Sequence, residues 1–225
     1  MRRLTIVATV TVASLLLATA AIAAFTQVSN VKFTTTKAGH STGIVADIHS
    51  TSDSAQELKG AKLVVLKFPA GTKFQLGLVK ACQLSDQQLT SGKACPAASK
   101  VGSGSAQASA YPLPQTITAA VTAFAAGPHS MTILVKATQP IPQTLVIHAT
   151  VSGSKLTIPV PTPSVAGVKI VLTSLQLNVP ARGSGRSALI SAGRCTNHTF
   201  IVKSHFAYTD GTALDMQSSS PCRLR

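Results

Sequence analysis

The sequence predicts an exported all-β protein, an antiparallel β-sandwich of the immunoglobulin-like or jelly-roll-like kind, stapled by two disulfides. Three observations predict this fold. A signal-like segment opens the chain, short β-rich runs fill the rest, and 12 prolines and four cysteines are spread along it. After residue 24 no segment carries an apolar stripe at helical spacing over three turns, so long helices are not expected.

The first 24 residues have the layout of a secretory signal peptide. Met1-Arg2-Arg3 is a charged start, the following residues are apolar or small, and Ala21-Ile22-Ala23 offers a small-x-small cleavage site. An uncleaved anchor is the alternative, because the stretch from Leu4 to Phe25 is just long enough to span a bilayer. We expect cleavage, and therefore a secreted or extracytoplasmic protein that is also able to associate with a surface.

Residues 25–225 are expected to form a single secreted β domain. Two smaller β lobes, at about residues 25–112 and 113–225, are the alternative.

The strand signals follow one another along the chain. Runs at 43–48 and 62–68 are rich in β-formers, and Phe74, Leu76 and Leu78 alternate with polar residues or glycine, as in a half-buried strand. The same pattern returns at 131–136, 145–151 and 156–160. Between residues 168 and 179 the apolar positions change from even to odd numbers, which predicts a bulge or break near Ser174.

The four cysteines are expected to form two disulfides, for which the sequence allows three pairings. Asp210-Gly211 between two strand-like segments predicts a hairpin, and its ends would bring Cys195 and Cys222 together. A bridge between Cys82 and Cys95 would close the other loop. Zinc is not expected, because the chain has no Cys-x-x-Cys motif, and neither a metal nor a cofactor is predicted.

The loop between Cys82 and Cys95 also carries the one helical signal. Ser85 followed by Gln88 has the spacing of a capping box, which predicts one short helical turn near residues 85–90.

Charge suggests a partner class. Loss of Arg2 and Arg3 from the 20 basic residues leaves 18 against six acidic residues, a net charge of +12. For an exported protein this favours anionic envelope polymers or lipid headgroups over a specific nucleic acid, with a merely solvated surface as the alternative. The oligomeric state is not predicted. The candidate polyanion contacts are Lys32, Lys37, Lys59, Lys100, Lys155, Arg182, Arg186 and Arg194.

Several short elements between residues 60 and 222 stand out: Phe68–Phe74, Ala81-Cys82, Ala94-Cys95-Pro96, Ser99–Gly104, Leu172–Leu175 and Ser220-Pro-Cys222. Together they resemble uncharacterised secreted bacterial β-proteins, in which a Cys-Pro-x-x-Ser-x-Val/Ile-Gly element and two local cysteine pairs recur. The resemblance covers most of residues 60–222 and implies export, local disulfides and a β-fold, but no catalytic residue.

No catalytic motif stands in a suitable context. Residues 39–43 match G-x-S-x-G, but too little chain precedes them to supply the sheet that this motif needs. We therefore expect a non-enzymatic, cell-envelope-associated binding or structural protein. Two alternatives are a secreted hydrolase that uses His49 or His148 with an acid and a serine, and a carrier of an apolar ligand, which would need an internal cavity.

Overall fold

The computed structural model describes residues 25–55, 57–113, 115–139, 142–161, 164–165 and 168–223. The predicted signal peptide at residues 1–24, like its alternative as an uncleaved anchor, lies outside the described residues. Within the described part of the chain, no helix is both long and apolar enough to cross a membrane.

Eleven strands form one antiparallel sheet in the order β1-β2-β11-β5-β6-β7-β8-β9-β3-β13-β14. A twelfth, β10 (Ser164–Val165), pairs with β11 only, while β4 (Lys73–Phe74) and β12 (Ile190–Ser191) pair with each other. The eleven strands are β1 (Thr26–Phe33), β2 (Ile44–Thr51), β3 (Ala61–Lys67), β5 (Lys100–Tyr111), β6 (Thr116–Gly127), β7 (Ser130–Gln139), β8 (Gln143–Ser152), β9 (Lys155–Pro159), β11 (Val168–Val179), β13 (Thr199–Tyr208) and β14 (Ala213–Pro221).

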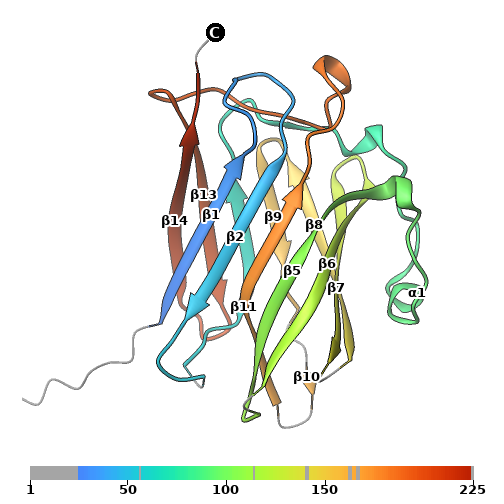
Figure 1. Cartoon of the computed structure of the whole chain (residues 1–225), viewed down its shortest axis with the longest axis vertical. Coiled ribbons are helices and arrows are strands. Elements are labelled where there is room, and N and C mark those ends of the chain that lie inside the picture. The colour runs from blue at the N-terminus through green and yellow to red at the C-terminus, as the bar shows by residue number, and fades with distance from the viewer. Residues whose placement is uncertain are drawn as a thin grey trace, which may run out of the picture.

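The sheet curls until its first and last strands lie side by side, so that it is nearly closed, like a barrel (Figure 1). The predicted two-layer sandwich is therefore not confirmed. A period-two pattern marks one buried face of each strand, but it does not say whether a second sheet or the far side of the same sheet covers that face. Here the far side of the same sheet covers it.

The two edge strands, β1 and β14, are joined by side-chain hydrogen bonds and not by a ladder of backbone hydrogen bonds. The Ser218 hydroxyl on β14 accepts a hydrogen bond from the Val31 N–H of β1 at 3.1 Å and donates one to the Val31 carbonyl at 2.8 Å. The hydroxyls of Ser29 and Ser204 pair at 3.0 Å in the buried interior beside it. We call this junction of β1 with β13 and β14 the seam. It satisfies edge groups that would otherwise remain open.

The predicted irregularity in β11 is confirmed. Leu172 pairs with Ala108 and Ser174 pairs with Gln107, so Thr173 is an extra residue on the β11 side. The bulge keeps Leu172 and Leu175 on the same face of the sheet, which is why the apolar positions change phase there.

Both predicted disulfides are present, Cys82–Cys95 and Cys195–Cys222. The predicted hairpin joins β13 to β14 across Asp210-Gly211. The predicted turn is the short helix α1 (Asp86–Thr90), where Ser85 and Gln88 form the capping box. Three single 3₁₀ turns complete the helical elements of the described chain: η1 (Leu76–Leu78), η2 (Ala97–Ser99) and η3 (Gly185–Ser187).

The strand expected over residues 74–78 is wrong beyond Phe74. The chain turns into the 3₁₀ turn η1, because the Gln75 side chain and backbone donate hydrogen bonds to the carbonyls of Ala188 and Leu189, both at 2.8 Å. Such distant partners leave no trace in a local alternation of apolar residues.

Candidate functional site

The curled sheet encloses a cavity of about 220 Å³. Alternate residues of β2, β3, β5, β6, β7, β8, β9 and β11 line its wall, among them Ala46, Ala119 and Ile147. Almost all of these side chains are aliphatic, because the same period-two pattern that built the strands directs their apolar residues inward. The interior is thus an apolar chamber with room that protein atoms do not fill.

Aromatic side chains close one end of the cavity. Phe33 lies 5.0 Å from Phe200 and 5.8 Å from Phe68, and Phe68 lies 5.2 Å from Phe74, measured between ring centroids. Leu189 from the loop after β11 is 2% exposed and completes the closure. Edge-on and stacked rings of this kind pack densely, which seals this end against water.

The opposite end is less covered, and we call it the mouth. Ile48, Leu145 and Ile158 line the cavity near the strand ends there and are only partly buried. Gln27 and Gln143 add neutral polar groups to the same rim. A molecule in the cavity would therefore meet aliphatic walls inside and hydrogen-bonding amides at the mouth.

Among the described residues that line the cavity, one is ionisable: Lys59. Its ammonium contacts the Asp210 carboxylate at 3.1 Å and the Thr212 hydroxyl at 3.1 Å, and it lies over the rings of Phe25 and Tyr208. Lys59, one of the predicted polyanion contacts, thus already has a carboxylate partner. Through these contacts Lys59 links the β2–β3 loop to the β13–β14 turn.

This ion pair belongs to a small polar cluster. Hydrogen bonds from the side chain and backbone of Thr212, with a smaller contribution from Lys59, lower the pKa of Asp210 to about 2. Burial, and then the nearby Asp210 charge, raise the pKa of Tyr208 to about 12. The two pKa shifts favour the protonation states present in the cluster, an ionised carboxylate at Asp210 and a neutral phenol at Tyr208.

Four segments gather at the closed end, residues 34–43, 68–76, 180–198 and 222–223, and we call them the basic cap. Backbone hydrogen bonds join them: Gly39 N–H to the Ala192 carbonyl at 2.9 Å, Arg194 N–H to Ala70 at 2.8 Å, and Arg223 N–H to Thr36 at 2.6 Å. In Figure 1 these loops lie at the top of the sheet, where the chain ends. The cap is therefore one connected surface, opposite the mouth.

The cap carries six exposed cations: Lys37, Lys73, Arg182, Arg186, Arg194 and Arg223. Its four segments contain no acidic residue. Asp53, Glu57 and Asp210, by contrast, lie in the loops at the mouth end.

The cap brings together four of the predicted polyanion contacts, Lys37, Arg182, Arg186 and Arg194. Lys100 adjoins it, because its carbonyl accepts a hydrogen bond from the Arg182 guanidinium at 2.7 Å. Lys32 and Lys155 are exposed on strands β1 and β9, outside the cap.

Sequence reasoning missed Lys73 and Arg223. Arg223 could have been found, because it follows Cys222 and Arg194 precedes Cys195, so both arginines adjoin the same disulfide. Lys73 reaches the cap through the pairing of β4 with β12, opposite Ser191, which has no local signal.

The histidines of the hydrolase hypothesis lie elsewhere. His49 contacts Asp47 at 3.9 Å and His148 contacts Asp86 at 2.9 Å, and all four side chains are more than 40% exposed. Neither histidine lines the cavity. Within the described residues, no group of three His, Cys, Asp or Glu side chains is placed to hold a metal ion.

Comparisons with known proteins add nothing to these observations. No family model, no curated protein and no solved structure matches the chain significantly. The resemblance to secreted bacterial β-proteins stays a prediction from the sequence motifs.

Proposed function

We propose that this protein binds an apolar small molecule inside its curled sheet. The main support for this proposal is the cavity of about 220 Å³ with aliphatic walls. An apolar cavity of about 150 Å³ is already large enough to hold benzene. A ligand that fills this space removes its aliphatic walls from water, which favours binding by about 25 cal/mol per Å² of apolar surface buried.

The lining also defines the class of ligand. A charged group inside would be desolvated among aliphatic side chains without a partner, which is strongly unfavourable. Gln143 and the buried Ser50 can donate or accept hydrogen bonds near the rim, whereas the Gln27 amide already bonds to the Tyr208 hydroxyl and the His49 carbonyl. The ligand is therefore a neutral molecule, apolar over most of its surface, with any polar group at the mouth end.

The proposed setting is outside the cytoplasm. Two disulfides indicate an oxidising compartment. Together with the predicted signal peptide, they favour a secreted carrier or receptor of apolar molecules. An enzymatic function has less support, because Lys59 is the one ionisable side chain among the described residues of the cavity lining, and it is already paired with Asp210.

A pair of variants on strand β6 tests the proposal. Ala119 lines the cavity and is 7% exposed, whereas its neighbour Ala120 is exposed on the outer face. Ala119→Phe places a phenyl ring in the cavity, and Ala120→Phe places the same ring in solvent. Fluorescence titration with N-phenyl-1-naphthylamine, a neutral apolar probe, measures binding in the two variants and the wild type.

We expect the wild type and Ala120→Phe to bind the probe with similar affinity, and Ala119→Phe to bind at least tenfold more weakly. Circular dichroism and the melting temperature confirm that each variant is folded. Equal binding by all three proteins would place the probe on the outer surface and contradict the proposal, as would a folded wild type that binds none.

A further inference from the structure

We infer that the basic cap binds a phosphate-bearing polyanionic polymer and so holds the protein with its mouth facing away from that polymer. This inference goes beyond the proposed ligand binding and does not depend on it, because it rests on charged side chains at the opposite end of the sheet.

The ion pairs of the described chain do not include the cations of the cap. In the part of the chain that the structure describes, four ion pairs form, and each involves Lys59 or a histidine. None includes Lys37, Lys73 or an arginine. Because the cap segments also lack carboxylates, their positive charges add to one another without internal compensation.

The arginines are concentrated in this one surface. Four arginines lie within the described residues, Arg182, Arg186, Arg194 and Arg223, and all four belong to the cap. The lysines, by contrast, are distributed over the strands and loops of the whole molecule. A guanidinium binds phosphate through two parallel N–H groups, which an ammonium cannot do, so this segregation favours phosphate groups as the partner.

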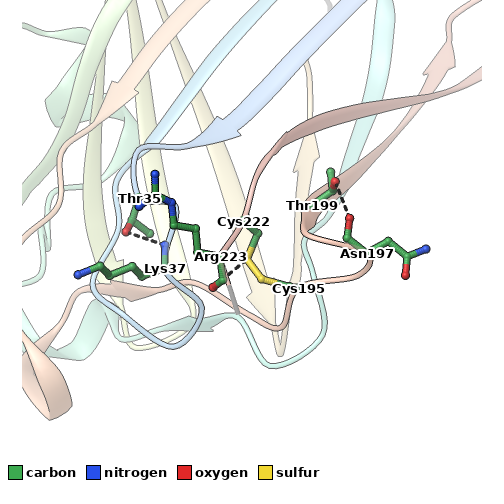
Figure 2. The surroundings of a disulfide bond; sticks show 7 residues. All are labelled: Thr35, Lys37, Cys195, Asn197, Thr199, Cys222 and Arg223. Atoms are coloured by element: carbon green, nitrogen blue, oxygen red, sulfur yellow. Dashed lines mark hydrogen bonds between the residues drawn. A yellow bond between two sulfur atoms is a disulfide. The ribbon is translucent and has the colours of Figure 1, made fainter. Parts of the chain in front are cut away.

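The cap is also fixed in shape before it binds. Figure 2 shows Lys37 and Arg223 side by side, next to the Cys195–Cys222 disulfide. The backbones of Lys37 and Arg223 form an isolated β-bridge, and the Arg223 N–H donates a hydrogen bond to the Thr36 carbonyl. Arg194 precedes Cys195 and bonds through its own N–H to Ala70. A surface with a fixed backbone loses little conformational entropy when it binds.

A polymer fits this surface better than a membrane does. Stable attachment of a basic surface to a bilayer combines electrostatic attraction with inserted apolar side chains or a lipid anchor. The large apolar side chains that are exposed in the described chain all lie outside the four cap segments; they are Val28, Val45, Leu78, Leu113, Leu172 and Leu214. The described residues of the cap can thus contact phosphates, but they offer no large exposed apolar side chain for insertion into a bilayer.

Two variants of equal net charge test the inference. The cap variant replaces Lys37, Arg186, Arg194 and Arg223 with glutamine and keeps Arg182, whose guanidinium holds the Lys100 carbonyl. The control variant replaces four exposed lysines outside the cap with glutamine: Lys62, Lys93, Lys136 and Lys203. Fluorescence anisotropy measures the binding of end-labelled long-chain inorganic polyphosphate at 50 and 150 mM salt.

We expect the cap variant to bind polyphosphate at least tenfold more weakly than wild type, and the control variant to change less than threefold. Wild-type affinity should also fall as salt rises, because the contacts are electrostatic. A third variant with Arg186, Arg194 and Arg223 changed to lysine should bind more weakly than wild type despite its unchanged charge.

Equal losses in the cap and control variants would overturn the inference, because they would show a response to net charge alone. Absence of polyphosphate binding by folded wild type would also overturn it. Sedimentation with phosphatidylglycerol vesicles distinguishes lipid headgroups from a phosphate polymer as the partner. Binding to the vesicles without binding to polyphosphate would assign the cap to a membrane instead. None of these outcomes depends on whether the cavity binds a ligand.

Discussion

Replacement of Ser218 by alanine tests how the two edges of the sheet are held together. Ser218 is 8% exposed, and its hydroxyl makes both hydrogen bonds to Val31, which is 1% exposed. The alanine variant loses two hydrogen bonds, each worth about 1 kcal/mol net, and leaves the N–H and carbonyl of Val31 without that partner. A buried group without a partner costs about 1–3 kcal/mol more, unless water enters and relieves it.

We therefore expect Ser218→Ala to lower the free energy of unfolding by roughly 2–4 kcal/mol. Urea unfolding at pH 7 measures this loss, and an unchanged slope against urea shows that the surface exposed on unfolding is the same. Ser219→Ala is the matched control, because Ser219 is exposed on the other face of β14 and should change stability by less than about 0.5 kcal/mol. A loss for Ser218→Ala as small as that of the control would refute this account of the seam.

Two further predictions concern the ends of the sheet. At the mouth, Thr212→Val should raise the pKa of Asp210 from about 2 towards its ordinary value of 3.8, as followed by carboxyl NMR shifts. Because the folded pKa is depressed, the stabilisation is complete above about pH 3.8 and is lost as the pH falls towards 2; an unchanged pKa would contradict this role of Thr212. In the cap, Cys195→Ser with Cys222→Ser opens a loop with a sequence separation of 27. Thermal or urea unfolding should show a loss of about 3–4 kcal/mol, and a loss under 1 kcal/mol would indicate that the disulfide constrains the unfolded chain little.

Local chemistry made a large part of the fold predictable. The capping box at Ser85, the Asp210-Gly211 turn and the cysteines at the hairpin ends each depend on residues close in sequence. The bulge at Thr173 was predictable as well, because a phase change in a period-two pattern requires an extra residue. In these cases the neighbours along the chain are also the neighbours in space.

The curl of the sheet and its cavity were not predictable in the same way. β11 lies between β2 and β5, and β3 lies between β9 and β13, so the strand order depends on contacts between distant segments. The inward residues, such as Ala119 and Ile147, are the same types that fill a densely packed core. Their sequence pattern gives the direction of each side chain but not the distance across the interior, and that distance decides whether a cavity remains.

The basic cap was predictable in part. Lys37, Arg182, Arg186 and Arg194 were recognised as separate cations, but their common location depends on loop-to-loop hydrogen bonds such as that of Gly39 with Ala192. The same list included Lys59, because a sequence shows a charge without its partner. Asp210, 151 positions later in the chain, is that partner.

We propose that the cavity inside the curled sheet can hold an apolar molecule. A crystal structure of the protein under xenon pressure tests it most directly, because xenon binds apolar cavities without any specific polar contact. We expect xenon inside the curled sheet, in contact with Ala119, Ile147 and other residues of the cavity wall. An interior in which side chains fill the space and no xenon binds would contradict it.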